Sequence, residues 1–176
     1  MLIRNKFLSD EEYKHLAEVL KRNRTDPHAL IIEIGLVTGA RACELLTITK
    51  KDLFEQNFSI QIIGRKGSRP REIPVTKEFF KALQLYSSQM KPDELLFKFK
   101  WTTVRKYWCK YRPARKGMHS LRHTFAVRLF KKTRDIRLVS MALGHKALQN
   151  TMIYAQFVYT DEELRGAITS LDEVKT

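Results

Sequence analysis

Cysteine is scarce in this chain, and long apolar runs are missing. The two cysteines, Cys43 and Cys109, lie far apart and form no Cys-x-x-Cys pair, so the sequence carries no zinc or redox motif. The longest apolar stretch, at residues 30–37, is broken by Glu33 and is too short to span a membrane. Residues 1–6 hold no apolar core of signal-peptide length. We therefore expect a soluble protein of a reducing, cytoplasmic-type compartment, with no membrane partner.

Acidic residues are nearly absent from one long segment. Residues 98–137 contain 14 Lys or Arg and a single acid, Asp135, so this segment carries +13 of the formal net charge of +14. Aromatic side chains are interleaved with these charges. A solvated basic face above core aromatics is one interpretation. Counterion release from phosphates rewards such a surface, however, and the asymmetry favours a nucleic-acid partner.

The 176 residues suffice for one domain with a real core, and their patterns predict mostly helices. Ser9, followed three residues later by Glu12, forms a capping box that opens a helix to about residue 22. Pro27 suits the first turn of a second helix, which Gly39 ends. Further helices are expected at about residues 41–46, 77–88, 102–111, 120–133, 136–143, 149–154 and 161–170.

The pattern changes in the middle of the chain. Residues 58–63 alternate and are rich in β-branched side chains, and residues 71–75 can return beside them as an antiparallel partner. Residues 64–70 then form the connecting turn, whose glycines are free to adopt positive φ. The organisation is α+β, mainly helical with one small antiparallel sheet.

Residues suited to phosphodiester chemistry recur as short boxes. His119-Ser120-Leu121-Arg122-His123 is followed by Leu143-Gly144-His145 and then by Tyr154. Upstream, Thr38-Gly39-Ala40-Arg41 supplies a second arginine, and Lys66-Gly67-Ser68-Arg69 a lysine in the predicted turn. Cationic groups around a tyrosine, with no carboxylate cluster for a metal, indicate nucleophilic attack on a phosphodiester. In these boxes the chain resembles the catalytic domain of the tyrosine recombinases, the phage integrase and Xer family.

The boxes assign a nucleophile and two phosphate ligands. A phenol with a pKa of about 10 is a weak nucleophile at neutral pH, so Tyr154 needs cationic neighbours or a base. Tyr159 is its rival, and the family spacing favours Tyr154. Arg41 and Arg122 suit the non-bridging oxygens, because a guanidinium stays charged and can donate two parallel hydrogen bonds to phosphate. Glu44, one turn after Arg41, either orients that arginine or caps the helix.

The remaining groups handle protons. Lys66 fits the general acid that protonates the departing 5′ oxygen, with Arg65 as its substitute. His119 would accept or relay the tyrosine proton, and His145 would donate to a phosphate oxygen. His123, next along the helix, is expected to point elsewhere and to be structural.

The resemblance covers residues 7–159 and implies a helical fold with a three-stranded antiparallel sheet. It also implies that Tyr154 attacks a DNA phosphate, forms a 3′-phosphotyrosyl link and releases a 5′ hydroxyl, without metal, ATP or another cofactor. Strand exchange between double-stranded DNA sites then usually takes place in a tetramer. Family members normally carry an N-terminal core-binding domain as well. Because the first predicted helix begins at Ser9, residues 1–176 are expected to form a single catalytic domain without it, either as an excised fragment or as a naturally short family member, of bacterial, archaeal, phage or plasmid origin.

Other functions share part of this pattern. A type IB topoisomerase would use the same catalytic residues to relax supercoils, and a recombinase-like regulator would bind DNA without cutting it. A metal-dependent nuclease needs clustered acids, which are missing near the basic boxes apart from Glu44. A zinc site of His119 and His145 lacks a third ligand at metal spacing. Outside the catalytic set, the DNA contacts are expected from basic residues of the hairpin turn and of the helix at residues 102–111: Arg65, Arg69, Arg71, Arg105, Lys106 and Lys110.

Overall fold

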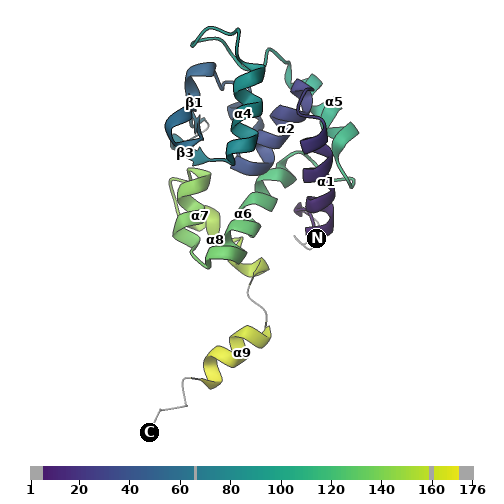
Figure 1. Ribbon diagram of the computed structural model, residues 1–176. Helices are drawn as coiled ribbons and strands as arrows, with labels where there is room; N and C mark the ends of the chain where they lie inside the picture. The colour runs from purple at the N-terminus through teal and green to yellow at the C-terminus, as the bar shows by residue number, and fades with distance from the viewer. Residues whose placement is uncertain (1–5, 66, 159–160, 171–176) are drawn as a thin grey trace.

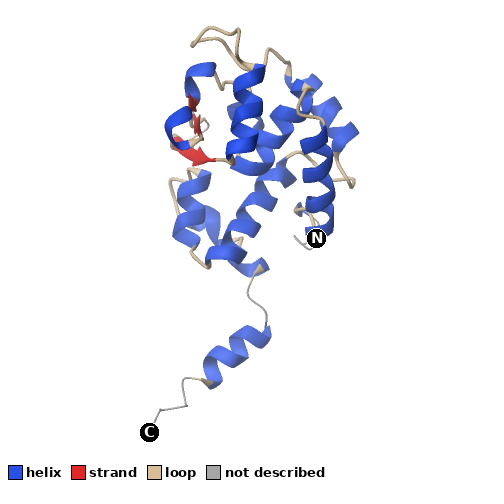
Figure 2. Cartoon of the chain, viewed as in Figure 1, coloured by secondary structure: helices blue, strands red, loops and turns tan. Residues whose placement is uncertain are grey.

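The computed structural model describes residues 6–65, 67–158 and 161–170. Lys66 and Tyr159 lie outside the described residues. Within these ranges the chain is mainly helical with one small sheet, as predicted (Figure 1, Figure 2). The elements in chain order are α1 (Asp10–Arg22), α2 (Pro27–Thr38), α3 (Ala42–Leu45), η2 (Lys50–Asp52), β1 (Leu53–Phe54), η3 (Glu55–Asn57), β2 (Ser59–Ile62), β3 (Arg71–Pro74), α4 (Lys77–Tyr86), α5 (Trp101–Tyr111), α6 (His119–Thr133), α7 (Ile136–Leu143), α8 (Gln149–Met152), η4 (Ala155–Phe157) and α9 (Asp161–Thr169).

The predicted starts of the first two helices are confirmed. The Ser9 hydroxyl accepts a hydrogen bond from the N–H of Glu12 (3.1 Å), and the Glu12 carboxylate accepts one from the N–H of Ser9 (2.8 Å). Asp26 caps α2 by accepting from a backbone N–H two residues on (2.9 Å), and Pro27 occupies the first turn. These bonds satisfy N–H groups that a helix start leaves without an internal partner.

The sheet is antiparallel, in the order β1-β2-β3. β2 and β3 are the strands that the alternation predicts, and they pair with Ile60 opposite Ile73, both buried. The third strand, β1, is only two residues long and pairs through Leu53 with Ile60. Two residues are too few to show an alternation, so the sequence pattern does not locate this strand.

Helix α2 lies at the centre of the main core. Its side chains are buried on all sides, from Ala29 to Leu36, and it packs against α1, α5 and α6 (Figure 1). A helix that is apolar all round is typical of such a central position. Each fully buried Leu or Ile contributes roughly 1.5–3 kcal/mol. The charged exception is Glu33, whose carboxylate lies 2.6 Å from the guanidinium of Arg24.

A smaller apolar cluster joins α6, α7 and the chain that follows α8, and it includes Tyr154. The sequence predicts a helix over residues 149–154, but Tyr154 lies outside the observed helix. Helix α8 ends at Met152, and the N–H of Tyr154 bonds to the carbonyl of Thr151 (2.9 Å), three residues back. This tighter 3₁₀ bonding ends the α-helix before the tyrosine and turns its ring into the cluster.

The C-terminal helix α9 lies apart from the body of the molecule (Figure 1). Ile168 on this helix is exposed. In the part of the chain that the structure describes, no helix has both the length and the apolar character needed to cross a bilayer.

Candidate functional site

Four segments bring the predicted catalytic residues together. Arg41 immediately precedes α3, Arg122 lies near the start of α6, His145 follows α7, and Tyr154 follows α8. Arg122 is at the centre, only 2% exposed, and its Nη2 donates to Nε2 of His145 at 2.9 Å. The charges of Arg122 and Arg41 both act on the Tyr154 phenol. The fold thus gathers residues that are more than 100 positions apart in the sequence.

Two helix ends hold Arg122 in place. Its Nη1 donates to the carbonyl of Gly39 and its Nη2 to that of Leu143, each at 2.8 Å. These carbonyls lie at the C-terminal ends of α2 and α7, which carry partial negative charge. Gly39 and Gly144 end the two helices with φ of 62° and 68°. A Cβ on Gly39 would also lie 2.5 Å from Cδ1 of Phe125, so both the backbone angle and the available space require glycine there.

The charge of Arg122 is retained in this setting. Burial, followed by the charges of Arg41 and Arg71, lowers the pKa of Arg122 to about 10. The guanidinium therefore stays protonated at neutral pH and remains a donor to any anion that reaches it.

Glu44 is fully buried and serves two arginines. Its Oε2 accepts from the backbone N–H of Arg41 (2.8 Å) and from Nη2 of Arg71 (2.9 Å), and its Oε1 accepts from Nη1 of Arg41 (3.3 Å). Burial by itself raises the pKa of Glu44, but the hydrogen bonds from Arg71 and Arg41 outweigh it and hold the pKa below its ordinary value. The sequence left open whether Glu44 orients Arg41 or caps the helix, and the structure shows that it does both.

His145 has a defined tautomer. Its Nε2 faces Nη2 of Arg122, and a guanidinium can only donate, so Nε2 is the unprotonated acceptor. Burial, followed by the charges of Arg122, Arg41 and Arg71, lowers the pKa of His145 to about 4, so the ring is neutral near pH 7. The single ring proton then lies on Nδ1 and is donated to Oγ1 of the fully buried Thr151, 2.7 Å away. The sequence assigns no chemical role to Thr151, which lies six residues after His145 and precedes Tyr154 by three.

Tyr154 is 3% exposed, and its hydroxyl contacts His123. Nδ1 of His123 lies 3.2 Å from the phenol oxygen. The prediction that His123 points away from the site is therefore wrong. Arg122 and His123 are adjacent on α6, where successive side chains diverge by only about 100°, so both can border the same site. Burial raises the pKa of Tyr154 above its ordinary value, although Arg122 and Arg41 act against the shift.

His119 starts α6 and lies at the surface of the site. The residue is exposed, and its ring meets that of His123 edge to face with centroids 4.6 Å apart. Packing around the ring, followed by the charges of Arg122 and Arg41, lowers the pKa of His119. Among the described residues, no hydrogen bond joins His119 to Tyr154.

The basic residues of the hairpin point in two directions. Arg65 and Arg69 are exposed, as a DNA-contacting role requires. Arg71 is only 8% exposed; it donates to Glu44 and, from Nε, to the carbonyl of Ala142 at 2.8 Å. The sequence predicts Arg71 as a surface contact to DNA, but β3 turns this side chain inward, where it neutralises a buried carboxylate.

Helix α5 presents a basic face. Arg105, Lys106 and Lys110 are exposed, whereas Val104 and Trp108 on the opposite side are buried. The helix is anchored by its apolar side, and its charges are available to a polyanion. Their contact with DNA remains a prediction.

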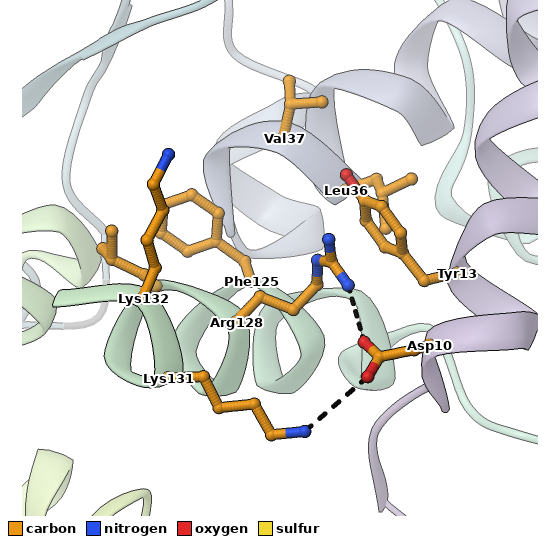
Figure 3. Close-up of a pocket in the computed structure, with 9 residues that line it drawn as sticks. Asp10, Tyr13, Leu36, Val37, Phe125, Arg128, Lys131 and Lys132 are labelled. Atoms are coloured by element: carbon orange, nitrogen blue, oxygen red, sulfur yellow. Dashed lines mark hydrogen bonds and ion pairs between the residues drawn. The ribbon is translucent and has the colours of Figure 1, made fainter. Parts of the chain in front are cut away.

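One cavity reaches the site, and a second lies elsewhere on the molecule. The larger, about 960 Å³, runs between β3 and α7 and reaches His145. The other, about 490 Å³, lies between α1, α2 and α6 (Figure 3). There Arg128 donates to Asp10 at 2.7 Å and stacks on Tyr13, while Lys131 approaches the same carboxylate (Figure 3). The described catalytic candidates do not line this second cavity. Within the described ranges, no three His, Cys, Asp or Glu side chains are grouped so as to hold a metal ion.

The fold is that of a tyrosine recombinase catalytic domain. The chain matches the Phage integrase family over residues 6–160, and it belongs to that family. It is 34% identical over 170 residues to the tyrosine recombinase XerH of Campylobacter jejuni subsp. jejuni, an alignment that covers 86% of this chain and 48% of the relative.

Solved structures show the same similarity. A crystal structure of the XerH site-specific recombinase bound to difH substrate, a pre-cleavage complex, superposes with a TM-score of 0.74 at 26% identity, over 96% of this chain and 55% of that one. The catalytic domain of bacteriophage HP1 integrase superposes with a TM-score of 0.67 at 26% identity, over 93% of this chain and 94% of that one. The chain therefore spans about half the length of XerH and nearly all of the HP1 catalytic domain.

Proposed function

We propose that this chain is the catalytic domain of a site-specific DNA recombinase, in which Tyr154 attacks a phosphodiester of double-stranded DNA. The observation that carries the proposal is the convergence of Arg41, Arg122 and His145 on a single buried tyrosine. The similarity to a DNA-bound XerH complex and to a catalytic domain of nearly equal extent supports it. The basic face of α5 supplies the charge that a DNA backbone requires.

The reaction needs charge at the non-bridging oxygens of the phosphate. We assign this role to Arg41 and Arg122, whose positions are fixed before substrate arrives by Glu44 and by two helix ends. Negative charge grows on these oxygens in the transition state, where donors that are already in place contribute most. Arg122 would exchange part of its backbone and histidine contacts for phosphate contacts.

His145 is assigned to a non-bridging oxygen as well. To donate from Nε2 it must carry its proton there, with Nδ1 then accepting from the hydroxyl of Thr151. A hydroxyl can both donate and accept, so this change of tautomer keeps the contact between His145 and Thr151 intact.

Proton transfers complete the scheme. As Tyr154 bonds to phosphorus its phenol proton must leave, and the 5′ oxygen that departs must receive one. We keep Lys66 as the donor to the 5′ oxygen, because residues that follow it closely in the sequence contact Gly144, next to His145. The N–H of Arg69 bonds to the carbonyl of Gly144 at 2.8 Å, and the Ser68 hydroxyl bonds to the same carbonyl at 3.1 Å. The product is a 3′-phosphotyrosyl link, which a second 5′ hydroxyl reverses. Strand exchange in this scheme would take place between DNA-bound copies of the chain, in a tetramer.

A covalent-adduct assay tests the proposal. The wild type and Tyr154→Phe are incubated, in EDTA, with nicked duplexes that tile the DNA flanking the protein's own gene, and the products are separated on a denaturing gel. A shifted protein–DNA band with the wild type alone supports the proposal. DNA binding by both proteins without any band refutes cleavage and favours a DNA-binding regulator. Supercoil relaxation at no particular site indicates a topoisomerase.

A further inference from the structure

The nucleophile has a hydrogen-bond partner that the sequence interpretation does not use. The hydroxyl of Tyr154 lies 3.2 Å from Nδ1 of His123, with ring centroids 5.8 Å apart. His119, the residue expected to take the tyrosine proton, is exposed and touches His123 rather than the phenol. A group that removes a proton must lie within hydrogen-bond reach of it, and of these two histidines His123 meets that requirement.

The surroundings of His123 keep its ring neutral. Burial, followed by the charges of His119, Lys6 and Arg122, lowers the pKa of His123 to about 4. A neutral imidazole has one nitrogen with a free lone pair. With its proton on Nε2, His123 presents that lone pair through Nδ1 to the hydroxyl of Tyr154. The groups that face the ring are His119 and Arg122 on its own helix, Lys6 from the N-terminal segment and Tyr154.

We infer that His123 accepts the phenol proton when Tyr154 attacks DNA, an assignment that rests on the proposed function. The O–H bond of Tyr154 breaks and an N–H bond forms at Nδ1, which leaves an imidazolium. The phenol oxygen bonds to phosphorus, and the bond from phosphorus to the 5′ oxygen breaks, with Lys66 supplying the proton for that oxygen. In the reverse step a 5′ hydroxyl attacks phosphorus and gives its proton to Lys66, which the forward step left neutral, while Nδ1 returns its proton to the departing phenolate.

This assignment gives His119 a different role. Its exposed ring lies at the open side of the site, within range of the charges of Arg41 and Arg122. An exposed ring at this place is accessible to a DNA phosphate. In this assignment His119 binds the substrate backbone, and the half-buried His123 handles the proton. The phosphate also brings a negative charge that favours the imidazolium of His123 during the reaction.

The test uses single-turnover adduct formation by the full chain on the nicked duplex that the wild type cleaves, in EDTA, over a range of pH. His123→Asn keeps an amide near the position of Nδ1, so it preserves a hydrogen bond to the phenol but not a base. His119→Asn is the matched variant, and His15→Asn, at an exposed position on α1, is the control. We expect His123→Asn to slow cleavage by about 100-fold or more and to flatten the dependence on pH. His119→Asn should retain the wild-type pH profile.

A sulfur substitution separates the two proton transfers. A duplex with a 5′-bridging phosphorothiolate at the mapped cleavage position has a sulfur leaving group, which needs no acid. On this substrate the cleavage rate of Lys66→Ala should recover, whereas cleavage by His123→Asn should stay slow. Cleavage by His123→Asn within about threefold of the wild type overturns the assignment, and so does recovery of this variant on the sulfur substrate. Absence of any adduct with the wild type instead overturns the proposed function itself, and this inference with it.

Discussion

Oγ1 of Thr151 lies 2.7 Å from Nδ1 of His145, whose other ring nitrogen accepts a hydrogen bond from Arg122. The three side chains form one hydrogen-bonded row, and both ends of the row are buried. Because the guanidinium of Arg122 can only donate, it keeps Nε2 unprotonated, and the threonine hydroxyl accepts the proton that Nδ1 then carries.

Replacing Thr151 by Val should both destabilise the protein and slow catalysis. The substitution keeps the shape of the side chain but leaves Nδ1–H of His145 without an acceptor, at a cost of roughly 1–3 kcal/mol. We expect the rate of adduct formation to fall by about 10-fold or more. Thr151→Ser, which restores the hydroxyl, should recover most of the rate. Nitrogen NMR of the histidine ring reports the tautomer, and an unchanged spectrum and rate in Thr151→Val would contradict this role.

Glu44→Gln should destabilise the protein strongly. It leaves the guanidinium of Arg71, which is nearly fully buried, without its counter-charge, and removal of one partner of a buried ion pair typically costs about 3–5 kcal/mol. Urea unfolding measures the change. Glu94→Gln is the control, because Glu94 pairs with Lys98 at the surface and its loss should change little. Equal effects of the two substitutions would show that Glu44 does not act through a buried pair.

Most of the helices, two strands and the candidate residues of the site could be predicted from the sequence because each has a local signal. A capping box, a glycine after an apolar stretch and a proline in the first turn act within a few residues of the chain. The arginine, histidine and tyrosine boxes could be recognised by their spacing alone. Strand β1 gave no such signal, since two residues show no periodicity.

The errors concern directions and partners that only tertiary structure determines. His123 could not be assigned to Tyr154, because the contact depends on how the chain turns after Met152. The sequence predicts Arg71 at the DNA surface because it belongs to the same basic hairpin segment as Arg65 and Arg69. Its inward direction depends on Glu44, 27 positions away, which the hairpin brings beside it.

Gly39→Ala should unfold at lower urea concentration than the wild type. The residue has φ of 62°, and a Cβ there would overlap the ring of Phe125. Strain of this kind costs about 1–3 kcal/mol, and it would displace the carbonyl that holds Arg122. Gly117→Ala is the matched control, since no atom lies within 4 Å of the added methyl group and φ is not positive. A Gly39→Ala protein as stable as Gly117→Ala would mean that the helix end adjusts freely.

Stability should fall as the pH drops from about 6.5 toward 4. The pKa values of His123 and His145 are each lowered to about 4, by burial first and then by neighbouring positive charge. Between these limits the unfolded chain binds protons that the folded protein excludes, so acid favours unfolding. A pKa shift of this size corresponds to at most roughly 3 kcal/mol in the free energy of unfolding per histidine, and solvent access to both rings reduces this contribution.

Urea unfolding at several pH values checks this expectation. In His123→Asn and His145→Asn the slope between pH 6.5 and 4 should become shallower. Glu44 affects stability at lower pH. Its pKa lies below the ordinary carboxyl value, and its contribution to stability is lost as the pH falls through this lowered pKa. Equal stability at pH 7 and pH 5 would contradict burial of the two neutral rings.

Removal of the charges on α5 should weaken DNA binding and reduce its dependence on salt. Arg105, Lys106 and Lys110 are exposed on one face of the helix, and each phosphate contact contributes about 0.9 to the slope of log affinity against log salt concentration. The triple alanine variant should therefore lose up to about 3 units of slope.

A second triple variant, of the exposed lysines Lys14, Lys81 and Lys91, changes the net charge equally but leaves α5 intact. Fluorescence anisotropy with a labelled duplex at several salt concentrations compares the two. Equal slopes in both would show that the chain attracts DNA through its net charge rather than through α5, whereas a loss confined to the α5 variant places this helix on the phosphate backbone.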